Sequence, residues 1–224
     1  MPDLPVPRVA FAATGVANLA SIMAAFRRAG AEPFLAADPA ELSSAAFAVL
    51  PGVGSFGSAM SALSAAGMDA AIRDRITREK PTMGVCAGMQ LFFEGSEESP
   101  GVAGMAIVPG FFKRFPADLP VPQLGWNRVR PQGGGAVREG WAYFANSYRL
   151  SESPEGYAAS WADYGESFVA ALERPRIDPV VPGRAAGGPS LLLCQFHPEL
   201  SGPWGLALIE RWLGSADASK GGSS

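Results

Sequence analysis

The sequence contains only one histidine and two cysteines among its 224 residues. A zinc site built on three histidines is therefore excluded, and the cysteines lack the close spacing of structural zinc ligands. Because Cys86 and Cys194 lie far apart in the chain, no disulfide framework is expected, which favours a reducing compartment such as the cytoplasm. Any chemistry that needs an imidazole must use His197.

Charged residues are also scarce, at 17% of the chain, and the formal net charge is −3. Proteins that bind the phosphate backbone of nucleic acids normally carry a surplus of positive charge, so we expect no nucleic-acid partner. Residues 9–26 form an apolar stretch, but no positively charged segment precedes it, and Thr14, Gly15 and Asn18 interrupt it. We therefore expect neither a signal peptide nor a membrane span.

Short apolar runs alternate with helical patterns along much of the chain, which is typical of a parallel sheet covered by helices on both faces. The predicted strands are residues 9–12, 33–36, 45–50, 82–85 and 191–196. The predicted helices are residues 19–28, 58–78, 89–93 and 205–213.

The middle of the chain has a different pattern. Between residues 105 and 183, proline and glycine separate short runs at 126–129, 141–144 and 167–172, which indicates antiparallel strands and hairpins. The length suits one domain of ordinary size. We expect a single α/β domain over residues 1–213 and a flexible tail over residues 214–224.

The sharpest local signal is Gly84-Val85-Cys86-Ala87-Gly88, between an apolar strand and a helix. This pattern is typical of a nucleophile elbow with cysteine in place of serine. Glycine is needed on both sides because neighbouring backbones come too close for a Cβ atom. The turn presents the sulfur to a cleft, and the amide of Ala87 can face a developing oxyanion. Without this context, Cys86 would be interpreted as a small buried hydrophobe.

The second signal is His197-Pro198-Glu199, which follows an apolar strand. A cysteine nucleophile needs a base, and the base needs a group that orients it. In an extended segment, residues two apart point to the same side, so Glu199 is expected to hold the imidazole of His197 while that ring pairs with Cys86. The alternative interpretation is a lone structural or exposed histidine.

A glycine-rich loop, Pro51-Gly52-Val53-Gly54, follows another apolar strand. Such a loop can hold a phosphate or supply amides to an oxyanion. It is not a nucleotide-binding P-loop, because no Gly-Lys-Ser/Thr follows it.

Together, the elbow and the His-Pro-Glu run resemble the class I, or triad, glutamine amidotransferases, which use Cys-His-Glu on a flavodoxin-like α/β sheet. The resemblance is closest to the glutaminase subunit of imidazole glycerol phosphate synthase and runs from about Val9 to Leu213. The further segments that carry it are Pro51–Gly54, Gln90–Glu94, Ser96–Glu98, Gly125–Asn127, Tyr143–Phe144 and Ser147–Tyr148.

The resemblance implies that Cys86 attacks the side-chain amide of glutamine, forms a thioester and releases ammonia. His197 would move the proton and Glu199 would orient it, without a cofactor or a metal ion. The implied oxyanion hole is formed by Gly52, Val53 and Ala87. The residues implied to contact the substrate glutamine are Gln90, Glu98, Ser147 and Tyr148.

The resemblance also implies a partner. A separate (β/α)₈ cyclase subunit would receive the ammonia and form imidazole glycerol phosphate and aminoimidazole carboxamide ribotide, in histidine biosynthesis. The two subunits would form a heterodimer, with Asn18 and Trp126 on the shared face and no membrane involved.

Several positions depart from the pattern of that family. The first loop, residues 12–18, differs from its usual Asp-Tyr-Gly-x-Gly-Asn, and Ala87 replaces a common leucine. Gln123 and Asn146 stand where histidine is usual, and Leu200 stands where lysine is usual. These changes lie at the edges of the glutamine site and on the partner face.

Four alternatives remain open from the sequence. The first is a divergent paralogue that supplies ammonia to another synthase. The second is a non-catalytic interaction subunit, and the third is a cysteine hydrolase unrelated to glutamine. The fourth is the glutaminase subunit of pyridoxal phosphate synthase, which shares the Cys-Ala-Gly and His-Pro-Glu-Leu runs but lacks Gly-Trp-Asn.

Overall fold

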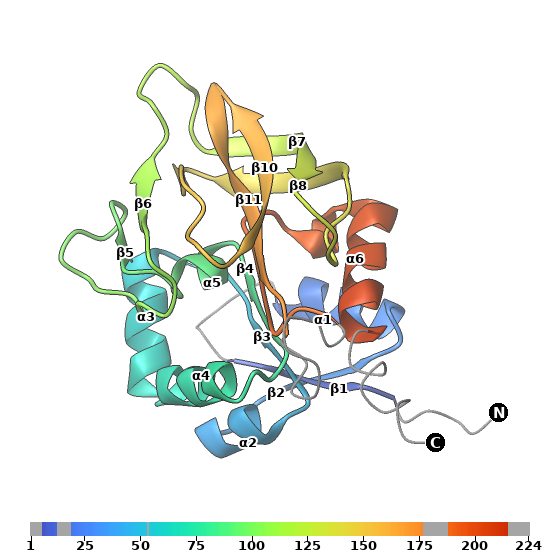
Figure 1. Ribbon diagram of the computed structural model, residues 1–224. Helices are drawn as coiled ribbons and strands as arrows, with labels where there is room; N and C mark the ends of the chain where they lie inside the picture. Colours follow the sequence, from blue (N-terminus) through green and yellow to red (C-terminus); the bar gives the residue numbers. More distant parts are fainter. Residues whose placement is uncertain (1–5, 13–18, 53, 177–187, 215–224) are drawn as a thin grey trace.

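A computed structural model describes residues 6–12, 19–52, 54–176 and 188–214 (Figure 1). Its main element is a nine-stranded sheet with the order β2-β1-β3-β4-β12-β11-β10-β7-β8. The first five strands in this order pair in parallel, as the alternating pattern predicts, and the rest pair antiparallel. The parallel strands are β1 (Arg8–Phe11), β2 (Glu32–Leu35), β3 (Phe47–Leu50), β4 (Thr82–Val85) and β12 (Leu191–Cys194).

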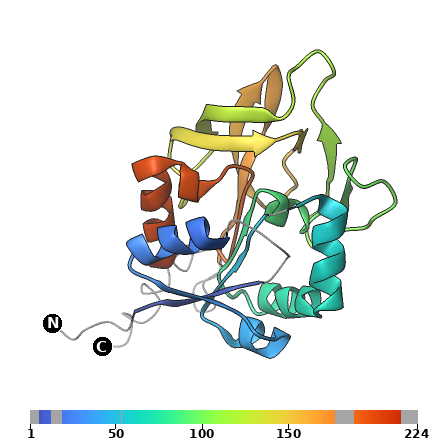
Figure 2. The same cartoon turned by 180° about the vertical axis from the view of Figure 1, so that it is seen from behind.

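Helices cover both faces of the parallel part (Figures 1 and 2). On one face lie α1 (Leu19–Arg28) and α6 (Gly202–Gly214), and on the other lie α2 (Pro39–Ser44), α3 (Phe56–Ala65) and α4 (Met68–Thr77). Successive strand side chains divide between the two faces, so that Leu192 and Cys194 join the α1–α6 core while Leu191 and Leu193 join the other core. Both cores are made largely of fully buried aliphatic and aromatic side chains.

The predicted helix over residues 58–78 is wrong in one respect, because the structure has two helices there. Gly67 lies between them with φ +66°, a left-handed conformation that glycine adopts without a steric penalty. The short helix α2 was not predicted. Its start has a recognisable signal, since the side chain of Asp38 accepts a hydrogen bond from the amide of Glu41 and Pro39 occupies the first turn.

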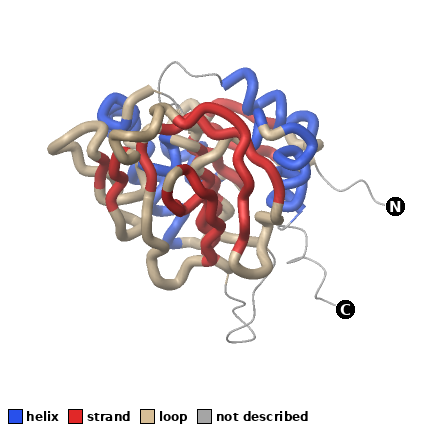
Figure 3. The backbone as a smooth tube through the Cα atoms, turned by 90° about the horizontal axis from the view of Figure 1, so that it is seen from above, coloured by secondary structure: helices blue, strands red, loops and turns tan. Residues whose placement is uncertain are grey.

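The antiparallel region contains the predicted strands as parts of longer ones, namely β7 (Gln123–Pro131), β8 (Gly140–Asn146) and β11 (Glu166–Arg174). Strand β10 (Ala158–Tyr164) was not predicted, because its sequence lacks β-branched residues. A separate small sheet joins β5 (Gly95–Ser96), β6 (Phe111–Arg114) and β9 (Tyr148–Arg149). Figure 3 shows from above how the strands and loops of the molecule are distributed.

At the C-terminus, α6 includes Gly214, so the helix extends one residue past the predicted end of the domain. The remaining tail residues, 215–224, lie outside the described part of the chain. Within the described part, no helix is both long and apolar enough to cross a membrane.

Strands β4 and β12 occupy the centre of the sheet and pair in parallel, with Val85 opposite Cys194. Their carboxyl ends therefore lie side by side. Cys86 follows the first strand directly, and the segment that contains His197 follows the second. In open α/β sheets this edge is where ligands bind.

Candidate active site

Cys86 occupies a sharp turn between β4 and the short helix α5 (Ala87–Gln90). Its backbone has φ +52° and ψ −118°, a conformation that a non-glycine residue rarely adopts. The amide of Cys86 donates a hydrogen bond to the carbonyl of Cys194 at 2.7 Å, which ties the turn to the end of β12. The strained backbone is the arrangement expected of a nucleophile elbow.

The glycines around the turn have no room for a side chain. A Cβ atom on Gly88 would lie 2.1 Å from the carbonyl oxygen of Leu50, and one on Gly84 would lie 2.8 Å from Cδ2 of Leu193. Gly52, in the loop after β3, is equally close to the elbow, with a Cβ position 2.3 Å from the amide nitrogen of Ala87. The loop after β3 therefore packs directly against the backbone of the elbow.

His197 and Glu199 contact each other through Nδ1 and Oε1, which lie 2.9 Å apart. The prediction of an extended segment is wrong beyond His197, because Pro198–Leu200 form a 3₁₀ turn, η1. The turn brings the carboxylate back towards the imidazole instead of relying on the alternation of a strand. The second carboxylate oxygen, Oε2, is buried without a hydrogen-bond partner in the described residues, so the carboxylate meets the imidazole through Oε1.

The backbone of His197 is fixed by strand β8. Its amide donates to the carbonyl of Tyr143 at 2.9 Å, and its carbonyl accepts from the hydroxyl of Ser201 at 2.6 Å. The same hydroxyl oxygen accepts a hydrogen bond from the amide of Tyr143 at 2.9 Å. The backbone of His197 is therefore held between β8 and Ser201, the residue that precedes α6.

Burial alone would lower the pKa of His197, but hydrogen bonds to Cys86 and Glu199 and the negative charge of these groups outweigh it and raise the pKa to about 10. The imidazole therefore holds its proton strongly. An imidazole that keeps a proton beside a cysteine sulfur favours a thiolate, which is the nucleophilic form.

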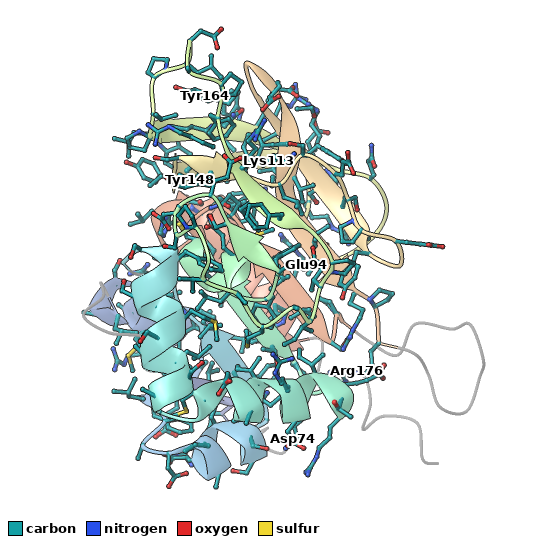
Figure 4. All side chains as sticks on the ribbon, turned by 90° about the vertical axis from the view of Figure 1, so that its left-hand side faces the viewer. Asp74, Glu94, Lys113, Tyr148, Tyr164 and Arg176 are labelled. Carbon is teal, nitrogen blue, oxygen red and sulfur yellow. The ribbon has the colours of Figure 1, made fainter. Side chains whose placement is uncertain are left out.

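A pocket of about 130 Å³ opens at the sulfur of Cys86. All four residues expected to contact substrate line it, namely Gln90, Glu98, Ser147 and Tyr148. Figure 4 shows Tyr148 in the part of the molecule near β6 and the upper end of α3, far from Asp74. The remaining lining residues are Gly54, Cys86, Ala87, Ala145 and Asn146.

One carboxylate oxygen of Glu98 already accepts a hydrogen bond, at 2.6 Å from the amide of Phe56 at the start of α3. The contact fixes the side chain at the pocket wall. Ala87, expected in the oxyanion hole, is the first residue of α5, so its amide has no acceptor within that helix. Val53, the other expected oxyanion residue beside Gly52, lies outside the described residues.

Trp126 lies outside the pocket, on the exposed face of the β7–β8 hairpin, with 54% of its surface accessible. Its ring packs edge to face against the ring of Tyr143, with 6.2 Å between the ring centroids. The backbone carbonyl of Tyr143 in turn accepts the hydrogen bond from the amide of His197. Leu124, Trp141 and Leu200 are also exposed. Asn18, the other residue expected at the partner face, lies outside the described residues, as do residues 13–17 of the divergent first loop.

Two contacts of the sulfur were missed by the sequence analysis. The thiol of Cys86 lies 3.9 Å from the carbonyl of Ala145, and the side-chain nitrogen of Gln195 lies 3.8 Å from the same sulfur. A signal for Gln195 existed, because it is a polar residue at the end of an apolar strand and two positions before the only histidine. No comparable signal marks Ala145, whose contact uses the backbone.

Solved structures with the same fold include a glutamine amidotransferase, with a TM-score of 0.70 at 17% identity, covering 93% of this chain and 98% of the other. The PurLQS structure from Thermotoga maritima matches with a TM-score of 0.68 at 15% identity, covering 93% of this chain and 97% of the other. At these identities the likeness concerns the fold, and it confirms the expected α/β class. No protein-family model matches the sequence.

Relatives of known name are more similar in sequence. The imidazole glycerol phosphate synthase subunit HisH of Symbiobacterium thermophilum is 36% identical over 210 residues, which cover 92% of each chain. The HisH subunit of Thermus thermophilus is 40% identical over 197 residues, 87% of this chain and 91% of the relative. On this similarity over about nine tenths of its length, the chain belongs to the HisH family of imidazole glycerol phosphate synthase subunits.

Proposed function

We propose that the chain hydrolyses glutamine to glutamate and ammonia, as the glutamine amidotransferase subunit of an imidazole glycerol phosphate synthase in histidine biosynthesis. The observation that carries this proposal is the convergence of Cys86, His197 and Glu199 at a pocket lined by the expected substrate residues. Family membership supports the same reaction.

In the first step, the thiolate of Cys86 attacks the side-chain carbonyl carbon of glutamine. The carbon–nitrogen bond then breaks, the imidazolium of His197 gives its proton to the leaving nitrogen, and ammonia departs. A γ-glutamyl thioester remains on the sulfur. In the second step, His197 takes a proton from water, the resulting hydroxide attacks the thioester, and glutamate leaves as the sulfur is released.

Glu199 keeps the ring of His197 in one orientation through the 2.9 Å contact with Nδ1, which leaves Nε2 for the sulfur and the substrate. The oxyanion formed in each step would accept hydrogen bonds from the amide of Ala87 and from the Gly52–Val53 peptide. The close approach of Gly52 to the amide of Ala87 supports this assignment.

Four residues would hold the substrate in the pocket. The carboxylate of Glu98 is suited to the ammonium group of a free amino acid, since it is fixed at the pocket wall and carries negative charge. Gln90, Ser147 and Tyr148 supply polar groups around it. This arrangement favours free glutamine over a glutamine residue within a peptide.

The ammonia would pass to a separate (β/α)₈ cyclase subunit in a cytoplasmic heterodimer. Trp126, with Asn18, would lie on the shared face, since Trp126 is exposed and connects through Tyr143 to the backbone of His197. Partner binding at this face would therefore act on the position of His197 through Tyr143. The glutaminase itself would be one domain, because the nine-stranded sheet continues without a break from the parallel strands into the antiparallel strands.

One observation favours a second candidate, a paralogue that feeds ammonia to another synthase. Leu200 follows the triad where the family usually has lysine, and its side chain is 40% exposed. An exposed leucine cannot form an ion pair across an interface, so it suits a partner with an apolar counterpart.

The experiment that tests the proposal measures glutamate release from glutamine by the chain alone, and then with the cyclase subunit and its ribonucleotide ligand. The proposal predicts strong stimulation by the liganded cyclase. Hydrolysis without stimulation would favour the second candidate, and no hydrolysis in either state would contradict the glutaminase and leave a non-catalytic interaction subunit.

A further inference from the structure

Gln195 is a fully buried polar residue for which the proposed reaction has no role. It follows β12 directly and precedes His197 by two positions. Its backbone amide donates to the carbonyl of Ala170 on β11 at 2.9 Å, so the position of the residue is set by the sheet. A buried amide side chain is costly unless both its ends find partners.

Both ends of the Gln195 side chain do find partners. Oε1 accepts a hydrogen bond from Nε2 of Gln90 at 3.1 Å, and Nε2 lies 3.8 Å from the sulfur of Cys86, within hydrogen-bond range for that atom. Gln90 lines the substrate pocket beside the sulfur. The two amides therefore form a chain that runs from the pocket wall to the nucleophile.

We propose that Gln195 is a second hydrogen-bond donor to the sulfur of Cys86, besides His197, and that Gln90 holds its amide in the donating orientation. This inference rests on the proposed function and adds a positioning residue to that site. The amide nitrogen can donate to a thiolate, and a hydrogen bond to an ionised atom in a buried setting is stronger than a neutral one.

The groups around the sulfur act in opposite directions. The carbonyl of Ala145, 3.9 Å away, can accept a hydrogen bond from a thiol but opposes the charge of a thiolate. The side-chain amide of Gln195 stabilises the thiolate against protonation, because its nitrogen donates a hydrogen bond to the sulfur. The titratable groups near the sulfur are His197 and Glu199 on the η1 side and Glu98 and Tyr148 on the pocket wall.

The test measures how fast iodoacetamide alkylates Cys86 at different pH values without glutamine, because only the thiolate reacts. Peptide mapping separates Cys86 from the fully buried Cys194. Gln195→Met keeps the length of the side chain but removes the hydrogen-bond donor. In this variant we expect the midpoint of the rate-against-pH curve for Cys86 to move up by about one pH unit. At pH values below the midpoint of the wild-type curve, alkylation should then be about tenfold slower.

Two further variants test the chain of amides. Gln90→Met should shift the curve in the same direction by a smaller amount, and the double variant should behave like Gln195→Met, because Gln90 acts through Gln195. Gln195→Glu keeps an acceptor for Gln90 and places a negative charge near the sulfur, so its shift should exceed that of Gln195→Met. The matched control is Gln132→Met, which makes the same substitution at an exposed glutamine outside the pocket and should leave the curve unchanged.

An unchanged curve in both folded Gln195 variants would overturn the inference, and so would a downward shift in Gln195→Met, which would mean that the amide oxygen faces the sulfur. Circular dichroism identifies the folded variants. Because the readout needs no glutamine, failure of this inference is separate from failure of the proposed function, which wild-type glutamate release decides.

Discussion

Nδ1 of His197 lies 2.9 Å from Oε1 of Glu199, and a 3₁₀ turn that begins at Pro198 creates this contact. The carboxylate has its other oxygen buried without a hydrogen-bond partner in the described residues. Its charge is therefore directed at the imidazole. This relationship explains how one short segment supplies both the base and the group that orients it.

Glu199→Gln should lower kcat for glutamine hydrolysis by roughly 10²–10⁴-fold, because an amide cannot stabilise the imidazolium and also permits the wrong ring orientation. KM should change little, since Glu199 does not line the substrate pocket. Steady-state kinetics checks this. Glu210→Gln, an exposed change on α6, is the control, and equal activity in both variants would remove Glu199 from the mechanism.

The raised pKa of His197 also predicts how stability depends on pH. A group whose pKa rises on folding binds its proton more tightly in the folded state, so it stabilises the fold fully below its unfolded pKa of about 6.5. That contribution is lost as the pH rises through the folded value of about 10.

Chemical denaturation of the wild type between pH 6.5 and pH 10 should therefore show a decline in the free energy of unfolding that His197→Asn lacks. NMR of the single histidine gives the pKa directly. A histidine that titrates near its ordinary value in the folded protein would contradict the electrostatic description of the site.

Gly88→Ala should destabilise the fold by on the order of 1–3 kcal/mol and reduce glutamine hydrolysis, because its Cβ would lie 2.1 Å from the carbonyl oxygen of Leu50. Gly134→Ala is the matched control, since a Cβ there meets nothing within 4 Å. Thermal unfolding and glutamate release compare the two. Equal stability would mean that the elbow has more room than the structure shows.

Trp126→Ala should weaken binding of the cyclase subunit by about tenfold or more, as for an exposed aromatic residue at an interface. Its effect on the thioester chemistry of the isolated chain should be smaller. Leu35→Ala is the control, an exposed apolar residue on β2 at the other edge of the sheet. Calorimetric titration measures both, and an unaltered affinity would place the partner elsewhere.

Much of the fold was predictable because its strands are short apolar runs with clear boundaries. The elbow was predictable for the same reason, since the two glycines at positions 84 and 88 are required by close backbone contacts that leave no room for a Cβ. The break at Gly67 was missed because an isolated glycine in a helical pattern is often tolerated.

The contacts of the sulfur were less predictable. Ala145 approaches it through a backbone carbonyl, and any residue type can do this. Gln195 reaches it only because β4 and β12 are neighbours in the sheet, a pairing that local sequence does not specify. The turn at Pro198–Leu200 likewise depends on contacts with β8 and α6.

The most direct test of the central claim is to mix the protein with isotope-labelled glutamine, quench with acid during turnover, and map the label by peptide mass spectrometry. We predict a γ-glutamyl group on Cys86, none on Cys194, and loss of both label and glutamate release in Cys86→Ala. Glutamate release that persists in Cys86→Ala, or a label on another residue, would contradict the account.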